Sequence, residues 1–178
     1  MNGKVRRFYE ELAAMSGLRL DPEGGALYGT YKGYGVAVLA PNPSYPYQMC
    51  AVFSASRPDG PLTKEECKQF LKEHKAAADL SQNGWQITMI IRGGIGQTHL
   101  RENFVQSLED TTAYLRGAGF TDCCQSCGKV TETDPCCVAG AYEHLCPDCY
   151  AALQQSRNQE SMRQAGKGEN ITGGLVGA

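Results

Sequence analysis

The pattern of apolar residues along the first half of the chain alternates between helical and strand periodicity. Four apolar residues at spacings of three and four predict an amphipathic helix ending near Gly17: Val5, Phe8, Leu12 and Met15. Three short runs rich in β-branched and aromatic residues follow, at 26–31, 34–40 and 48–55. Because Lys32-Gly33 can form a tight turn between the first two runs, we expect a three-stranded antiparallel meander.

Helical and strand signals alternate again up to about residue 118. Thr63 and Glu66 have the spacing of a capping box and predict a helix that begins after Pro61. The inward face of this helix carries Cys67, Phe70, Leu71, His74 and Ala78. The run 85–91 is predicted as a fourth strand, with Trp85 in the core. Thr98 can cap a last helix whose inward residues are Leu100, Phe104, Leu108 and Leu115.

This order of elements, α-β-β-β-α-β-α, predicts an α+β fold in which an antiparallel sheet carries its helices on one face. We assign this domain to residues 1–120. A small cysteine-rich module with a trailing helix is expected at 121–165, and a Gly-rich tail at 166–178.

Composition and charge narrow the functional classes. The apolar fraction of 42% supplies a hydrophobic core, and the net charge of −2 gives no general attraction to nucleic acid. The basic N-terminal residues are followed by Glu10 and Glu11, where a secretory signal peptide would need an apolar stretch. We therefore expect a cytoplasmic body with reduced thiols that are free to bind metal.

The cysteines are concentrated in one segment. Seven of the nine fall between Cys123 and Cys149, and four of these form two C-x-x-C pairs about 18 residues apart: Cys124, Cys127, Cys146 and Cys149. Two intervening residues allow a tight turn to aim both sulfurs at one ion, while backbone N–H groups of the turn donate to the thiolates. Four thiolates close a tetrahedral shell, so we expect one structural Zn²⁺ per chain and no catalytic position on it.

The segment between the two pairs resembles a β-hairpin with arms at 129–133 and 138–144, and a helix is expected to begin at the second pair. This layout is that of a treble-clef zinc finger, with a zinc ribbon as the second choice. Other ligand sets remain open. Cys123 can pair with Cys127, and His144 can replace one sulfur. Cys136 and Cys137 are spare thiols at the expected hairpin tip, and disulfides are a further alternative.

The charge of the module argues against a nucleic-acid-binding finger. Between residues 121 and 170 there are seven acidic residues and four basic ones, the reverse of what phosphate binding requires. The preferred role of the module is contact with another protein, or stabilisation of the fold by the metal alone.

One stretch has features of a ligand-binding loop. Arg92, Gly93, Gly94, Gly96 and His99 lie between a predicted strand and a predicted helix, where backbone amides can bind an anion. The stretch lacks the third glycine of a dinucleotide fingerprint and the Lys-Ser/Thr of a P-loop. A plain β-to-α connection is the simpler interpretation, and no catalytic residue is assigned.

The C-terminal third resembles a class of uncharacterised bacterial membrane-anchored proteins. The resemblance rests on the four paired cysteines, a polar stretch, and a Glu-Asn and Gly-rich apolar run at 169–178. In that class the run enters transmembrane helices. Here eight apolar or small residues are too few, because crossing a bilayer takes about 20. The other interpretation is a chain that ends in a glycine-rich tail.

The resemblance implies a non-enzymatic domain on the cytoplasmic face of a membrane, attached through a segment after residue 178. Its role would be protein interaction or scaffolding, with a protein partner or self-association. One alternative is a cytoplasmic enzyme or small-ligand binder that uses the loop from Gly93 to His99. A nucleic-acid-binding zinc protein is a further alternative that the charge disfavours.

Overall fold

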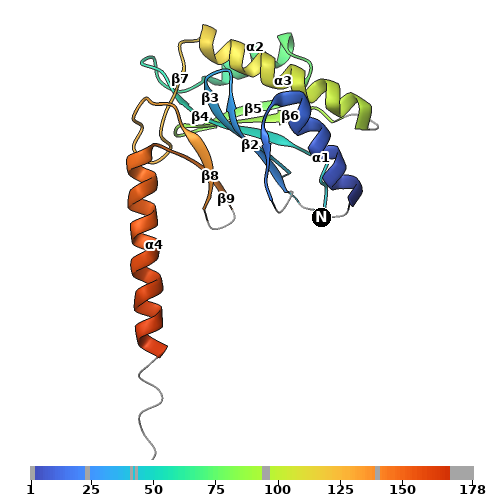
Figure 1. Ribbon diagram of the computed structural model, residues 1–178. Coiled ribbons are helices and arrows are strands. Elements are labelled where there is room, and N and C mark those ends of the chain that lie inside the picture. The colour runs from blue at the N-terminus through green and yellow to red at the C-terminus, as the bar shows by residue number, and fades with distance from the viewer. Residues whose placement is uncertain are drawn as a thin grey trace, which may run out of the picture. The chain divides into compact units, whose positions relative to one another are not determined.

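The computed structural model describes residues 3–22, 25–40, 42, 44–93, 97–138 and 141–168 (Figure 1). In chain order its elements are α1 (Gly3–Ser16), β1 (Arg19–Leu20), β2 (Ala26–Tyr31), β3 (Tyr34–Leu39), β4 (Cys50–Ser56), α2 (Lys64–Glu73), β5 (Ala77–Asn83), β6 (Gln86–Ile91), α3 (Gln97–Gly117), β7 (Thr121–Asp122), β8 (Asp134–Val138), β9 (Ala141–Leu145) and α4 (Pro147–Gly168). The chain divides into two compact units, Met1–Cys146 and Pro147–Ala178.

The first unit is an α+β fold built on an antiparallel sheet, as the sequence predicts. Six strands follow the order β1-β2-β3-β4-β6-β5, and β7 adds to β4 as the seventh. The turn between β2 and β3 is the predicted one, because Lys32 and Gly33 have φ angles of +49° and +87°.

The helices pack on one face of this sheet (Figure 1). Val36, Phe53 and Ile87 lie side by side on three neighbouring strands and are fully buried. They share one core with inward residues of α1, α2 and α3: Phe8, Leu12, Phe70, Phe104 and Leu108. The predicted layer of helices on one face is confirmed.

The opposite face of the sheet is covered over β2 and β3 by the cysteine-rich segment. The β8–β9 hairpin contacts both strands, and β3 and β4 are buried on both faces over almost their whole length. The hairpin itself lies later than expected, since its first arm is Asp134–Val138 and not 129–133. The segment between the two cysteine pairs is therefore part of the packing of the first unit.

Strands β1, β5 and the two-residue β7 were not predicted. β1 is a two-residue strand on the edge beside β2. The helix over the Thr63 capping box was expected to run on to Ala78, but α2 ends at Glu73 and Ala77–Asn83 forms the edge strand β5. β5 pairs with β6 through the turn Gly84-Trp85, where Gly84 has a φ of +58°. Pairing with β6 outweighs the helical spacing of the local sequence.

Trp85 was expected in the core and is not there. It occupies the β5–β6 turn with 40% of its surface exposed.

The second unit is the helix α4, whose described side chains are exposed or half-buried. Within the described residues, no helix has both the length and the hydropathy needed to cross a bilayer.

The start of α2 is held by an ion pair as well as by its capping box. Thr63 Oγ1 accepts from the Glu66 N–H at 3.1 Å, and Glu66 Oε2 accepts from the Thr63 N–H at 2.8 Å. The Arg57 guanidinium donates to both oxygens of the same carboxylate, at 2.7 and 2.8 Å. The bond to Arg57, followed by the bond to the Thr63 backbone, lowers the pKa of Glu66 to about 2.

Glu66→Gln is expected to lower the free energy of unfolding at neutral pH by about 1 kcal/mol, because the charge-assisted pair with Arg57 is lost, whereas the glutamine carbonyl can still accept from the Thr63 N–H and keep the capping box. The pKa of Glu66 is depressed on folding, so its contribution is present above pH 4.5 and is lost as the pH falls toward 2. Urea unfolding at several pH values measures this. The exposed neighbour Glu65 provides the control as Glu65→Gln, and equal effects of the two variants would contradict the assignment.

Candidate metal centre

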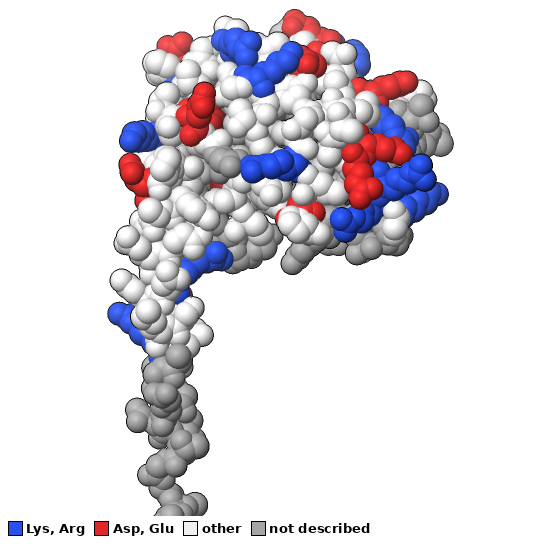
Figure 2. Space-filling view, viewed as in Figure 1, with Lys and Arg blue, Asp and Glu red and all other residues white. Residues whose placement is uncertain are grey.

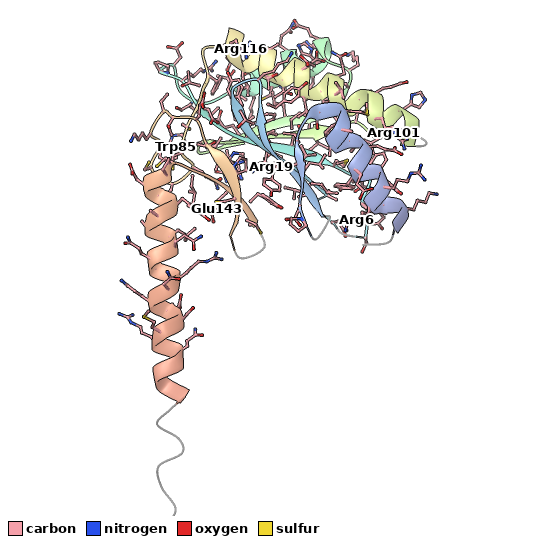
Figure 3. The ribbon with its side chains drawn as sticks, in the orientation of Figure 1. Arg6, Arg19, Trp85, Arg101, Arg116 and Glu143 are labelled. Atoms are coloured by element: carbon pink, nitrogen blue, oxygen red, sulfur yellow. The ribbon has the colours of Figure 1, made fainter. Side chains whose placement is uncertain are left out.

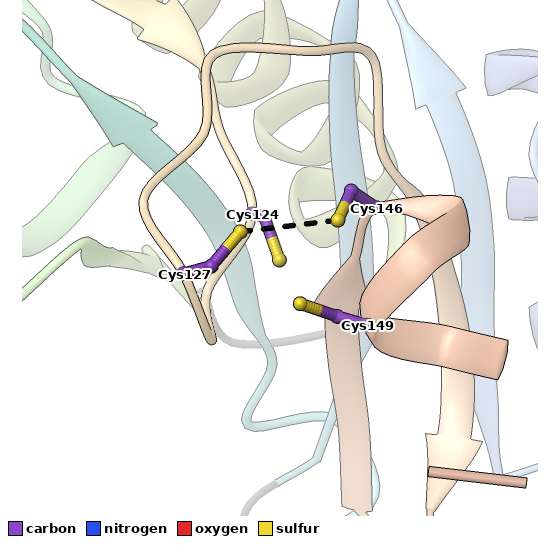
Figure 4. A group of neighbouring side chains, drawn as sticks. All are labelled: Cys124, Cys127, Cys146 and Cys149. Atoms are coloured by element: carbon purple, nitrogen blue, oxygen red, sulfur yellow. Dashed lines mark hydrogen bonds between the residues drawn. The ribbon is translucent and has the colours of Figure 1, made fainter. Parts of the chain in front are cut away.

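The sulfurs of four cysteines converge in the structure. The Sγ atoms of Cys124, Cys127, Cys146 and Cys149 lie within 4.8 Å of one another (Figure 4). Those of Cys127 and Cys146 are 3.8 Å apart. This separation is too long for a disulfide, whose sulfurs lie about 2.05 Å apart. It equals the edge of about 3.8 Å that four Zn–S bonds of about 2.3 Å give a tetrahedron. The four cysteines can therefore hold a metal ion.

The first C-x-x-C pair lies on a tight turn, or knuckle, that comprises residues 124–128. The N–H of Gly128 donates to the carbonyl of Cys124 at 2.8 Å, and the N–H of Cys124 donates to the carbonyl of Lys129 at 2.9 Å. Gly128 closes the turn with a φ of +71°, which favours glycine. The second pair follows β9, and its Cys149 lies in the first turn of α4.

The electrostatic environment of Cys124 favours its thiolate. Burial by itself raises the pKa of this thiol, but backbone N–H groups of Cys146, Cys127 and Ser126 donate to the sulfur and lower the pKa to about 6. Since the thiolate is the form that binds metal, the backbone prepares this ligand before an ion arrives. Cys124 and Cys146 are buried, Cys149 is half-buried, and Cys127 is exposed.

A buried carboxylate fastens the chain around the knuckle to the sheet. Asp122 accepts from the N–H of Gly35 at 3.2 Å, and from the N–H and hydroxyl of Thr133 at 2.6 and 2.9 Å. Burial raises the pKa of Asp122 to about 6, against the opposing effect of these donors. Gly35 leaves no room for a side chain, because a Cβ there would lie 2.4 Å from Thr133 Oγ1 and 2.8 Å from the Thr133 carbonyl oxygen.

The other candidate ligands lie elsewhere. His144 is fully buried and its pKa is lowered by burial to about 4. Its Nδ1 lies 3.1 Å from the position of a Cβ on Gly35, so the ring faces β3. The thiol of Cys123 lies 3.7 Å from the hydroxyl of Ser54, and Cys136 donates to the carbonyl of Glu143 at 3.5 Å. Cys137 is exposed. None of the nine cysteines, all of which are described in the structure, forms a disulfide.

The predicted ligand loop is only partly within the described residues, since Gly94 and Gly96 lie outside them. Arg92 donates to the carbonyls of Lys75 and Ala77 at 2.8 and 3.0 Å, so its guanidinium braces the entry to β5. His99 is 69% exposed and pairs with Glu102 at 3.7 Å. Gly93 is exposed. These described residues do not converge on a common point.

Two features near the sheet were missed by the sequence analysis. A groove of about 1030 Å³ lies between the sheet and the β8–β9 hairpin, with Leu39, Val52 and Tyr142 among its lining residues. The second is Trp85, whose ring lies against the knuckle at Gly128. The sequence gives little indication of this contact, because the Gly84-Trp85 dipeptide predicts a turn but not the segment against which the ring packs.

Gly35→Ala is expected to destabilise the first unit, since the new methyl group meets the Thr133 backbone and forces the segment off β3. A loss on the order of 1–3 kcal/mol in the free energy of unfolding is expected from such overpacking. Urea denaturation checks this. Gly117→Ala is the control, because a Cβ there meets nothing within 4 Å. Equal stability of both variants would show that the segment is not seated at Gly35.

No protein-family model matches the chain, and neither a curated protein nor a solved structure matches it. The site is therefore defined by its own geometry, as four converging thiols that can hold a metal ion.

Proposed function

We propose that the four cysteines hold one structural Zn²⁺, and that the protein is a non-enzymatic domain with a protein-interaction or scaffolding role. The observation that supports the zinc assignment is the convergence within 4.8 Å of four cysteine sulfurs that form no disulfide. Four sulfur ligands with tetrahedral spacing are typical of structural zinc. The lowered pKa of Cys124 supports binding at neutral pH.

A tetrathiolate site has a consequence for its chemistry. All four positions of a tetrahedral Zn²⁺ are filled by Cys124, Cys127, Cys146 and Cys149, so no position is left for a water or a substrate. The ion then supplies cross-linking: it joins the knuckle, the end of β9 and the first turn of α4. This is the basis for a stabilising role and not a catalytic one.

An interaction role fits the surface of the first unit. Ile90 and Val130, with 40% and 61% of their surface exposed, are large apolar residues open to solvent. Acidic and basic side chains are interspersed on the face seen in Figure 2, without the basic field that nucleic acid requires. The use of Arg92 as a brace and the exposure of His99 do not favour the alternative ligand loop. Attachment to the cytoplasmic face of a membrane remains the proposal that the sequence resemblance implies.

Elemental analysis of protein purified without added metal is expected to find one zinc per chain. The variant Cys146→Ser, Cys149→Ser is expected to lose the zinc and to melt at a lower temperature, because half of the ligands are gone. Cys136→Ser, Cys137→Ser is the matched control, since it removes two thiols from the same segment outside the cluster. Zinc retained by the first variant, or lost by the control, would disprove the ligand set.

A closed ligand shell is tested by replacing zinc with Co²⁺, whose visible absorption reports coordination. The expected spectrum is that of a tetrahedral tetrathiolate, and it should not change on addition of azide or imidazole, because no position is open. A spectrum that shifts with these ligands would reveal an open position. The structural role would then be wrong, and catalysis at the metal would become the leading hypothesis.

A further inference from the structure

The tryptophan of this chain lies beside the candidate metal centre. Trp85 is the sole tryptophan in the sequence, and it occupies the turn between β5 and β6, near the hairpin segment (Figure 3). Its backbone is fixed, because its carbonyl accepts from the N–H of Ala55 at 2.9 Å. With 40% of its surface exposed, Trp85 does little for the core of the sheet. Its placement needs another explanation.

The indole ring packs on the backbone of the knuckle. A Cβ built on Gly128 would lie 2.5 Å from Cζ2 of Trp85, and 2.9 Å from both Cε2 and Cη2. All three are atoms of the six-membered ring, so the edge of the indole fills the space that a side chain at position 128 would occupy. Glycine is required here twice, once for the φ of +71° and once for this approach.

The contact acts on two metal ligands through Gly128. This residue closes the knuckle by donating to the carbonyl of Cys124 at 2.8 Å, and it directly follows Cys127. The other end of the knuckle is also attached to the sheet, since the N–H of Cys123 donates to the carbonyl of Ser54 at 3.1 Å. The first ligand pair is therefore held between β4 at one end and the β5–β6 turn at the other.

Cys127 is the ligand for which this support matters most. Its thiol is exposed, whereas Cys124 and Cys146 are buried. Of the four candidate ligands, Cys127 is therefore the one that a chelator or a competing thiol reaches most easily. A ring packed on Gly128 opposes opening of the knuckle, because the knuckle cannot move without losing the contact with the indole.

We propose that Trp85 is a positioning residue of the metal centre: its ring clamps the first knuckle through Gly128 and slows the release of the bound ion. The inference rests on the zinc site proposed above. Residues that support metal ligands from behind typically change metal affinity by about 10- to 100-fold. For Trp85 we expect the change in affinity to arise from a faster loss of the metal, because the ring contacts the knuckle and not the ion.

Zinc release is measured by mixing the zinc-loaded protein with an excess of a chromogenic pyridylazo chelator. Trp85→Ala is expected to release zinc about 10-fold faster than the wild type, and Trp85→Phe to stay close to the wild-type rate because a ring is kept. Glu66→Gln controls for general destabilisation, since it weakens the helix start away from the knuckle. Wild-type release from Trp85→Ala, or equal acceleration by Glu66→Gln, would overturn the proposal.

A second pair of variants tests the contact from the other side. Gly128→Ala adds both backbone strain and a clash with the indole, whereas Gly119→Ala adds strain alone, because its φ is +77° and a Cβ there meets nothing within 4 Å. Faster zinc release is expected from Gly128→Ala than from Gly119→Ala. Equal rates would show that the indole contact does not hold the knuckle.

Fluorescence separates failure of this inference from failure of the zinc site. With Co²⁺ in the centre, the emission of Trp85 is expected to be quenched relative to the zinc-loaded protein, because the absorption of cobalt thiolates overlaps it. Protein that binds neither ion would disprove the proposed function itself. Protein that binds both ions but shows no quenching, or an unchanged release rate in Trp85→Ala, would disprove only the role of Trp85.

Discussion

The close approach of the cysteine-rich segment to β3 at Gly35 is the contact on which the arrangement of the first unit depends. Because Gly35 has no side chain, the Thr133 backbone can lie close to the strand. The Asp122 carboxylate accepts hydrogen bonds from the backbone N–H groups of both residues. Burying a carboxylate is costly unless donors surround it, and here three donors do so. These three hydrogen bonds offset the desolvation of the Asp122 carboxylate, and they also hold the cysteine-rich segment against the sheet.

Because the segment is held against the sheet in this way, the candidate ligand cysteines are already close to one another before an ion binds. Asp122 directly precedes Cys123, whose N–H is bonded to Ser54 of β4, and the knuckle begins at the next residue. The carbonyl of His144 accepts from the N–H of Gln125 at 2.7 Å, which ties the approach to the second cysteine pair to the first knuckle. Cys124, Cys127 and Cys146 thus belong to the same compact unit as the sheet. An ion would meet a largely formed set of ligands in place of an unfolded loop.

The same logic bears on function. If the four cysteines hold one tetrahedral ion, as we propose, no position on that ion is left for a substrate, and the surface of the first unit becomes the place to look for activity. The first unit offers exposed apolar residues and a groove beside the β8–β9 hairpin, and its charges are mixed. These properties suit contact with another protein better than contact with nucleic acid.

Features that depend on neighbours along the chain could be predicted from the residues alone. Helical periodicity located α1 and α3, the Thr63–Glu66 spacing located the start of α2, and Lys32-Gly33 located a hairpin turn. The C-x-x-C spacing pointed to the four cysteines that the structure brings together, because two residues between a pair of cysteines allow a tight turn that aims both sulfurs at one point.

The remaining features depend on contacts between separate segments of the chain. β5 is a strand because β6 pairs with it, although its own residues have a helical spacing. Gly35 must be glycine because of Thr133, and Trp85 leaves the core because Gly128 offers its ring a surface. The contacts of Gly35 with Thr133 and of Trp85 with Gly128 join residues tens of positions apart, so no local pattern records them, whereas β6 follows β5 directly in the chain. Packing geometry selects among conformations that local propensity leaves nearly equal in free energy.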